Sequence, residues 1–334
     1  TLWVPGTDHA GIATQHVVER QLAKEGLRRQ DLGRDRFLER TWQVKEKHHG
    51  IIKQQLQKIG CSCDWEHERF TMDEGLSQAV RECFVTLYER GLIYKGEYLV
   101  NYCPKCGTAL ADDEVEYQPV NAFLYDVRYP YSDGSGFITV ATTRPETMFG
   151  DVAVAVNPED ERYTHLVGKL LDLPLTDRKI PIIADSFVDK SFGTGMVKIT
   201  PAHDPNDWLC GKRHNLEKVN VLNPDGTLNE NCPYKYRNIN ANKARSLVVE
   251  DLKAQGFLVK ETAHDHDVGH CYRCSTVIEP YLSNQWFVSM KGMADKALQA
   301  WKDEKIVFYP KRWENTYSHW LENIHDWCIS RQLW

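Results

Sequence analysis

The chain has 334 residues, of which 42% are hydrophobic and 26% are charged, and its net charge is −6. This composition is that of an ordinary globular protein, and the length predicts two or three domains. It excludes a polybasic binder, although a local basic face could still bind RNA, and no apolar run is long enough to predict a membrane span.

The first hundred residues are predicted to be mainly helical. Apolar spacing followed by glycine predicts a helix over 12–25 and a longer one over 35–59. A third helix is expected over 73–90, where Thr71 and Glu74 have the spacing of a capping box. The apolar stripe of the second helix comprises Leu38, Trp42, Ile52, Leu56 and Ile59.

A β-rich segment begins near residue 120. Short runs of β-branched and aromatic residues, separated by Gly, Pro and Asp, predict a compact barrel or sandwich with a few helices, one of them over 241–255. After residue 270 the earlier pattern returns, with a strand near 286–290 and helices near 292–301 and from Trp313 onward. The order indicates one domain at both ends of the chain and a different domain inserted between them.

Four of the ten cysteines form two C-x-x-C pairs, Cys103 with Cys106 and Cys271 with Cys274. Two such turns suit a tetrahedral four-cysteine zinc site, which is structural because it has no open coordination position. Two unrelated turns with free thiols are the alternative. The histidine-rich residues 264–270 are interpreted as a polar loop, since the cysteines already complete a site. Paired C-x-x-C motifs with scattered thiols predict a cytosolic protein.

The segment ATTRPETMFGD, residues 141–151, places hydroxyls and a guanidinium at the end of an apolar strand. Its polar residues include Thr143, Arg144 and Thr147. A polar turn between a strand and a helix is the simpler interpretation. A site for a polar, partly anionic ligand is the alternative.

The segment GTGMVKITPAHDPNDW, residues 193–208, combines a strand with two carboxylates. Alternation along the strand puts Met196, Lys198 and Thr200 on one face. Asp204 and Asp207 follow the end of the strand. A carboxylate here could hold a ligand ammonium by a charge-assisted hydrogen bond. A solvated turn in which Asp204 caps a helix is an equal alternative.

Six strings resemble, in order and spacing, those of the valyl-tRNA synthetases, which are class I aminoacyl-tRNA synthetases. They are WVPGTDHAGIATQ, NYCPKCGTALADDEVEY, ATTRPETMFGD, GTGMVKITPAHDPND, VIEPYLSNQWFV and DWCISRQLW. The resemblance covers nearly the whole chain and implies an α/β fold. A partial Rossmann-type catalytic domain would be interrupted by a β-rich editing domain with a four-cysteine zinc stem. The implied parts are 1–118, 119–270 and 271–334.

The resemblance also implies an activity. Members of the family attach valine to tRNA(Val) with ATP and Mg²⁺, and they hydrolyse mischarged threonyl-tRNA(Val). The family's His-x-Gly-His and Lys-Met-Ser-Lys-Ser signatures do not occur in this sequence, so we expect an internal fragment of a cytoplasmic, monomeric ligase that retains editing alone. A free-standing aminoacyl-tRNA deacylase and a zinc-stapled RNA-binding module are the alternatives. The terminal motifs argue against the first, and the clustered polar residues argue against the second.

The family's motifs assign roles to residues of this chain. Asp8, with His9 beside it, is the candidate for holding the amino acid's ammonium in the catalytic domain, and Asp207 is the candidate in the editing pocket. The remaining pocket residues implied by the resemblance are Lys198, Thr200, Asp204, Arg144 and Thr147 as catalytic groups, and Thr143, Phe192 and Met196 as substrate-binding groups.

A second site is needed because, in this family itself, a hydrophobic pocket rejects threonine against valine by only about a hundredfold. The editing pocket would therefore recognise the threonine hydroxyl. No Ser–His or Cys–His pair indicates a covalent nucleophile, so we expect water to attack the ester, with Lys198 or Arg144 stabilising the oxyanion. Met196 stands where alanine is expected, and we hypothesise that it narrows the pocket.

Overall fold

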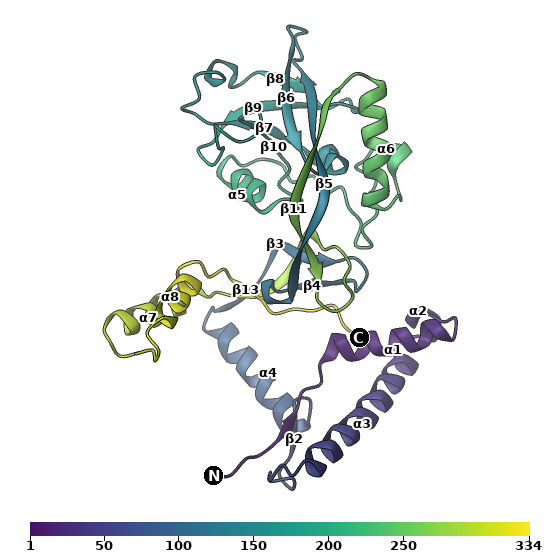
Figure 1. Cartoon of the computed structure of the whole chain (residues 1–334), viewed down its shortest axis with the longest axis vertical. Coiled ribbons are helices and arrows are strands. Elements are labelled where there is room, and N and C mark those ends of the chain that lie inside the picture. Colours follow the sequence, from purple (N-terminus) through teal and green to yellow (C-terminus); the bar gives the residue numbers. More distant parts are fainter. The chain divides into compact units, whose positions relative to one another are not determined.

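The computed structural model describes residues 1–334, and the chain divides into two units. The first unit comprises Thr1–Gly96 and Trp286–Trp334, and the second comprises Glu97–Gln285. Figure 1 labels many of their elements. The predicted insertion, 119–270, lies within the second unit. None of the helices combines the length and the apolar character needed to span a bilayer.

The first unit is mainly helical, as its apolar periodicity predicts. Its strands are short: β1 (Gly6–Thr7) runs parallel to β2 (Arg69–Phe70), and β13 (Trp327–Cys328) pairs with the end of β12 (Glu279–Val288), which enters from the second unit. Its helices are α1 (Gly11–Lys24), α2 (Arg29–Leu32), α3 (Arg34–Lys58), α4 (Glu74–Glu89), α7 (Lys291–Lys302) and α8 (Trp313–Glu322).

Two expectations for this unit were wrong in detail. Helix α3 buries Phe37 against Val18 and Leu22 of α1, whereas most of the predicted stripe of α3 is exposed, since Phe37 is the one residue of this helix that is fully buried. The cap of α4 is Asp73, whose carboxylate accepts from the backbone N–H of Leu76 at 2.8 Å. Thr71 does not form the predicted capping box, since its hydroxyl accepts from the N–H of His9.

The second unit contains a three-stranded antiparallel sheet in the order β11–β5–β6. The long strands β5 (Val115–Pro130) and β11 (Leu258–Cys271) pair along most of their length, and β6 (Phe137–Thr142) pairs with the end of β5. The predicted polar loop at 264–270 is therefore wrong, because those residues are part of β11. Backbone pairing with β5 outweighs the low apolar content of that sequence.

A four-stranded sheet in the order β10–β7–β9–β8 forms the centre of this unit. Its strands are β7 (Ala153–Val156), β8 (Leu170–Asp172), β9 (Lys179–Ala184) and β10 (Met196–Ile199). Both faces are buried: Val154 and Met196 contribute to the larger core cluster and Ile199 to a smaller one. Helix α6 (Ala241–Ala254) adds to the larger cluster, and α5 (Pro205–Arg213) adds Cys210 to the smaller one. The predicted alternation along β10 is thus confirmed.

Candidate functional site

The cluster of polar groups lies where β10 ends and α5 begins. The Asp204 carboxylate accepts from the backbone N–H groups of Asn206 at 2.8 Å and Asp207 at 3.1 Å. Asp204 is thus an N-cap, as the alternative interpretation of this segment proposed, and Pro205 occupies the first helical position. The cap fixes the first turn so that Asp207 Oδ2 accepts from the backbone N–H of Thr200 at 2.9 Å.

Asp151 joins this cluster to the ATTRPETMFGD segment. It follows the 3-10 helix η2 (Pro145–Gly150), and its side chain is wholly buried. Its Oδ1 accepts from the Thr200 hydroxyl at 2.5 Å, and its Oδ2 accepts from the Tyr129 hydroxyl at 2.7 Å. Lys198 Nζ donates to Thr200 Oγ1 at 2.5 Å and lies 3.6 Å from Asp151 Oδ1. Sequence reasoning missed Asp151, although a lone carboxylate before the apolar run VAVAV was an available signal.

The ionisable groups of this cluster perturb one another. Burial raises the pKa of Asp207 to about 7, and the nearby carboxylate of Asp204 adds to the rise while Lys198 opposes it. Burial also raises the pKa of Asp151. Burial alone would lower the pKa of Lys198, but the carboxylates of Asp151, Asp207 and Asp204 outweigh it and raise that pKa. One ammonium thus faces three carboxyl groups, and burial shifts two of these carboxyls, Asp151 and Asp207, toward their protonated form.

A second ionic network surrounds the TRPET motif. Arg144 Nε donates to Glu146 Oε1 at 3.1 Å, and Arg144 Nη2 donates to Glu279 of β12. Arg245 of α6 donates to both oxygens of Glu146 at 2.8 Å. Burial tends to raise the pKa of Glu146, but the hydrogen bonds from Arg245 and the charge of Arg144 lower it. The segment is thus a buried ion network, in which the charge of Arg144 is already balanced.

The other predicted pocket residues occupy different environments. The Thr147 hydroxyl is buried and donates to the carbonyl of Arg144 at 3.0 Å. Thr143 is half-buried in the turn after β6. Met196 is 6% exposed and packs in the larger core cluster, whereas Phe192 is 58% exposed. Among these groups, only Phe192 offers a large apolar surface to solvent.

Asp8 and His9 belong to the first unit. The Asp8 side chain is 76% exposed, and its Oδ1 accepts from the backbone N–H of Ala10 at 2.6 Å. His9 Nδ1 lies 2.7 Å from the hydroxyl of Thr71. These contacts hold the GTDHAG turn in place and leave the Asp8 carboxylate accessible.

His203 lies within the GTGMVKITPAHDPND string but is structural. Its Nε2 accepts from the backbone N–H of Val221 at 2.9 Å, so Nδ1 carries the proton and faces the carbonyl of Pro280 at 3.3 Å. Burial lowers the pKa of His203 to about 3, and the charge of Arg144 adds to the effect. A neutral, doubly hydrogen-bonded imidazole is not available as a general base at neutral pH.

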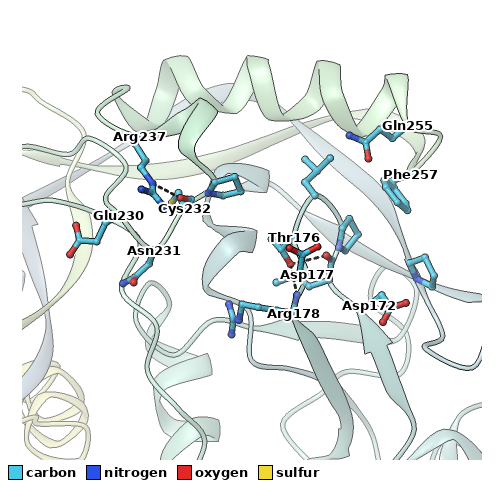
Figure 2. A pocket seen from close by; sticks show the side chains of 15 residues that line it. Asp172, Thr176, Asp177, Arg178, Glu230, Asn231, Cys232, Arg237, Gln255 and Phe257 are labelled. Carbon is cyan, nitrogen blue, oxygen red and sulfur yellow. Dashed lines mark hydrogen bonds between the residues drawn. The ribbon is translucent and has the colours of Figure 1, made fainter.

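A cavity of about 680 Å³ in the second unit is separate from the predicted residues (Figure 2). Its wall includes Asp177, Arg178, Glu230 and Arg237 and none of the predicted site residues. Arg178 connects it to the polar cluster, because its guanidinium donates to the backbone carbonyls of Phe149 at 2.6 Å and Asp151 at 3.0 Å. The contact fixes the backbone that carries the Asp151 carboxylate.

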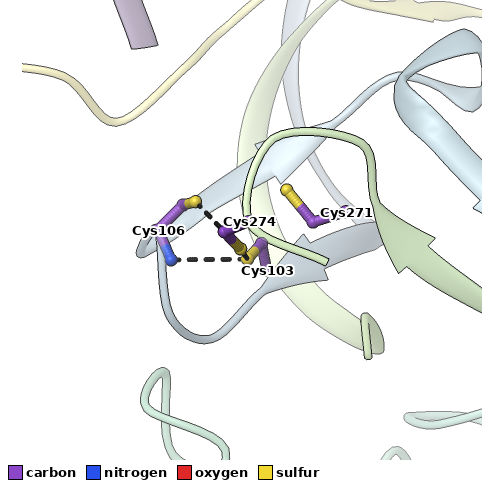
Figure 3. A group of neighbouring side chains, drawn as sticks. All are labelled: Cys103, Cys106, Cys271 and Cys274. Atoms are coloured by element: carbon purple, nitrogen blue, oxygen red, sulfur yellow. Dashed lines mark hydrogen bonds between the residues drawn. The ribbon is translucent and has the colours of Figure 1, made fainter. Parts of the chain in front are cut away.

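The four cysteines of the two C-x-x-C motifs come together, as predicted (Figure 3). Their sulfur atoms all lie within 4.8 Å of one another, and Cys274 Sγ is 3.5 Å from Cys103 Sγ and 3.6 Å from Cys106 Sγ. Four thiolates at about 2.3 Å from a tetrahedral zinc ion would be about 3.8 Å apart, whereas a disulfide requires about 2.05 Å. The geometry is therefore compatible with a four-cysteine zinc site that joins the β3 (Ile93–Cys103) turn to the end of β11.

Comparisons with known proteins agree over the whole length. The family model for class I tRNA synthetases (I, L, M and V) matches residues 1–334. The chain is 61% identical to the valine–tRNA ligase of Treponema denticola, 59% identical to that of Fusobacterium nucleatum and 58% identical to that of Geobacillus kaustophilus. Each match covers 100% of this chain and 38% of the relative. The chain thus spans a little over a third of the length of these curated relatives.

Proposed function

This chain belongs to the class I tRNA synthetases (I, L, M and V), and on that premise we propose that it is part of a valine–tRNA ligase whose second unit hydrolyses threonyl-tRNA(Val). The observation that carries the editing proposal is the Asp151–Thr200–Lys198–Asp207 cluster. It sets a half-buried ammonium and a buried carboxylate on one framework.

Asp207 is proposed to bind the α-ammonium of the aminoacyl ester. The N–H of Thr200 fixes one oxygen of the carboxylate, which retains further acceptor capacity. Burial raises the pKa of this carboxyl to about 7, and an ion pair with the ammonium of the ester would favour its charged form.

Lys198 is proposed to stabilise the oxyanion. Its ammonium has three donors, of which one is used by the Thr200 hydroxyl. Arg144 is less suited to this role, since Glu146 and Glu279 already balance its charge. Asp151 holds Thr200 and thereby fixes the direction from which Lys198 acts.

The reaction is ester hydrolysis without a covalent enzyme intermediate. Water attacks the carbonyl carbon, the bond from that carbon to the ribose oxygen breaks, and the ribose oxygen takes a proton to give free threonine and tRNA. The Lys198 ammonium stabilises the negative charge that develops on the carbonyl oxygen. Removing one such donor typically lowers the rate by about 10²–10³-fold.

Discrimination follows from the polar lining. Valine lacks the hydroxyl of threonine. A bound valine ester would therefore leave a buried polar group of the pocket without a hydrogen-bond partner, at a cost of about 1–3 kcal/mol. That cost corresponds to roughly 5- to 150-fold in rate or affinity between the two esters. This factor multiplies the rejection of threonine against valine by about a hundredfold that a hydrophobic site supplies in this family. Met196 is proposed to limit the depth of the pocket from the core side.

Zinc, if bound by the four cysteines, would supply a structural crosslink and no reaction chemistry. Valine activation, with ATP and Mg²⁺, is proposed for the longer protein to which this chain corresponds, and Asp8 and His9 would contribute there. The proposed partners are tRNA(Val), valine and threonine, and the proposed state is a cytoplasmic monomer. No residue of this chain is assigned to ATP or Mg²⁺.

The test is hydrolysis of threonyl-tRNA(Val) by the chain and by Lys198→Gln. Lys179→Gln is the matched control, because Lys179 lies on β9 of the same unit with its side chain 57% exposed. We expect Lys198→Gln to lose about 10²–10³-fold in rate and Lys179→Gln to retain it. Equal rates for the two variants would refute the assignment of Lys198.

A further inference from the structure

A smaller cavity, of about 230 Å³, lies in the second unit beside α5. Its wall includes Pro201, Trp208 and Gly211 together with two lysines, Lys212 and Lys218, and none of the residues that line it is acidic. A Cβ atom at Gly211 would lie 2.9 Å from Cγ of Pro201, so the missing side chain lets α5 pack closely on this wall. With about 30 Å³ for each water molecule, the cavity has room for a phosphate group and bound water.

The two lysines meet at one buried aromatic ring. Trp208 is 2% exposed, and the centre of its ring lies 4.9 Å from Lys212 Nζ and 4.7 Å from Lys218 Nζ. Lys212 is one helical turn beyond Trp208 on α5, a spacing that places both on the same side of the helix. The face of an aromatic ring attracts cations, so Trp208 gathers two like charges at the cavity. Its own indole N–H is buried without an acceptor.

Only one of the two ammonium groups has a carboxylate partner. Lys218 Nζ donates to Glu97 Oε2 at 2.8 Å, and this contact fixes its position. Lys212 Nζ lies over the rings of Trp208 and Tyr98, at 4.9 and 5.1 Å, and forms no ion pair. The cavity therefore keeps a positive charge in a chain whose net charge is −6, and an anion that enters it would be attracted by both ammonium groups.

The cavity adjoins the proposed editing cluster along the chain. Pro201 directly follows Thr200, and Trp208 directly follows Asp207. Lys212 is five residues beyond Asp207, which corresponds to about 7.5 Å along the axis of α5. A lysine side chain adds several ångströms to this reach, so the distance suits a nucleotide near the one that carries the ester.

We propose that Lys212 and Lys218 bind a backbone phosphate of the single-stranded 3′ end of the tRNA whose ester is hydrolysed beside Asp207. This inference rests on the proposed function. The phosphate would accept hydrogen bonds from both ammonium groups and would balance the charge that Glu97 leaves on Lys212. Phosphate contacts position a nucleic acid without reading its bases. The surface therefore holds threonyl- and valyl-tRNA(Val) alike and leaves their discrimination to the editing cluster.

The test measures the Kd of labelled, uncharged tRNA(Val) by fluorescence anisotropy at several salt concentrations. We expect Lys212→Gln to raise Kd by about 3–10-fold and to reduce the slope of log K against log salt by about 0.7, as for one lost contact to a single strand. Lys212→Arg keeps the charge and should retain the affinity. Lys243→Gln is the matched control, because Lys243 is likewise an exposed lysine on a helix of this unit.

Competition identifies the source of the phosphate. A single-stranded RNA with the sequence of the tRNA 3′ end should displace the labelled tRNA, whereas inorganic phosphate at the same ionic strength should not. Equal displacement by inorganic phosphate would indicate a site for the free ion and would overturn the assignment to nucleic acid. An unchanged Kd and salt slope in Lys212→Gln, or no binding of tRNA by the unchanged folded chain, would overturn the surface itself.

The binding assay is independent of the reaction. A chain that binds tRNA(Val) through Lys212 but does not hydrolyse the threonyl ester would support this surface and contradict the proposed function. A chain that hydrolyses the ester with the same KM in Lys212→Gln as in the unchanged protein would do the reverse.

Discussion

Replacing Asp207 with asparagine should stabilise the chain above neutral pH while it weakens hydrolysis. Asp207 is 4% exposed, and burial raises the pKa of its carboxyl from 3.8 to about 7. Between these two values the folded state holds a proton that the unfolded state has released. Stability contributed by this group is therefore complete below the unfolded pKa and is lost as the pH rises through about 7.

The size of the effect follows from the shift. About three pKa units at 1.36 kcal/mol each correspond to a loss of up to about 4 kcal/mol between about pH 4 and pH 8. Asparagine has nearly the same shape and still offers an oxygen to the N–H of Thr200, but it does not ionise. The variant should match the unchanged chain at about pH 4 and exceed it by up to about 4 kcal/mol at about pH 8.

The assay is urea unfolding followed by circular dichroism at several pH values. Asp189→Asn is the control, since Asp189 is exposed and Ser191 hydrogen bonds lower its pKa, so its replacement should give no stability gain at high pH. The same ionisation should make kcat/KM for threonyl-ester hydrolysis rise through about pH 7 in the unchanged chain. A stability difference that does not change with pH, or an asparagine variant less stable at high pH, would refute the reasoning.

Three further predictions concern the surrounding network. Arg245→Met leaves Glu146 with Arg144 alone and should lower the free energy of unfolding by about 3–5 kcal/mol. Adding Glu146→Gln to this variant should restore most of the lost stability. Urea unfolding of the single and the double variant measures both effects. Because the pKa of Glu146 is lowered, its contribution to the free energy of unfolding should be lost as the pH falls through that pKa. In a pH series of the same unfolding experiments, the stability of the double variant should therefore fall less steeply at acid pH. Met196→Ala should cost about 2–5 kcal/mol of stability and change the rate of threonyl-ester hydrolysis; an unchanged rate would contradict its proposed role in the pocket.

The sequence predicted those parts of the fold whose signals are local. Glycine stops and helical periodicity placed α1 and α6 within a residue or two, and alternation placed Lys198 on the correct face of β10. Spacing alone also predicted that the two C-x-x-C motifs meet, because four thiols on two short turns form a recurrent zinc-binding arrangement.

The parts that were missed depend on contacts between distant residues. Strand β11 has the composition of a loop and becomes a strand only because β5 supplies its hydrogen bonds. Asp151 gains its role from Tyr129 and Thr200, which come from two other segments. The partners of Arg144 are likewise far apart in sequence, since Glu279 lies on β12, and no local pattern would have indicated that its charge is already balanced.

The most direct test of the editing proposal compares two esters of one tRNA. The chain should hydrolyse threonyl-tRNA(Val) faster than valyl-tRNA(Val) by roughly 5- to 150-fold, as expected for one unpaired polar group in the valine complex. Asp207→Ala should abolish hydrolysis of the threonyl ester, because the variant no longer binds its α-ammonium. Equal hydrolysis of the two esters by a chain that circular dichroism shows to be folded would contradict the proposal that this cluster recognises a threonyl ester.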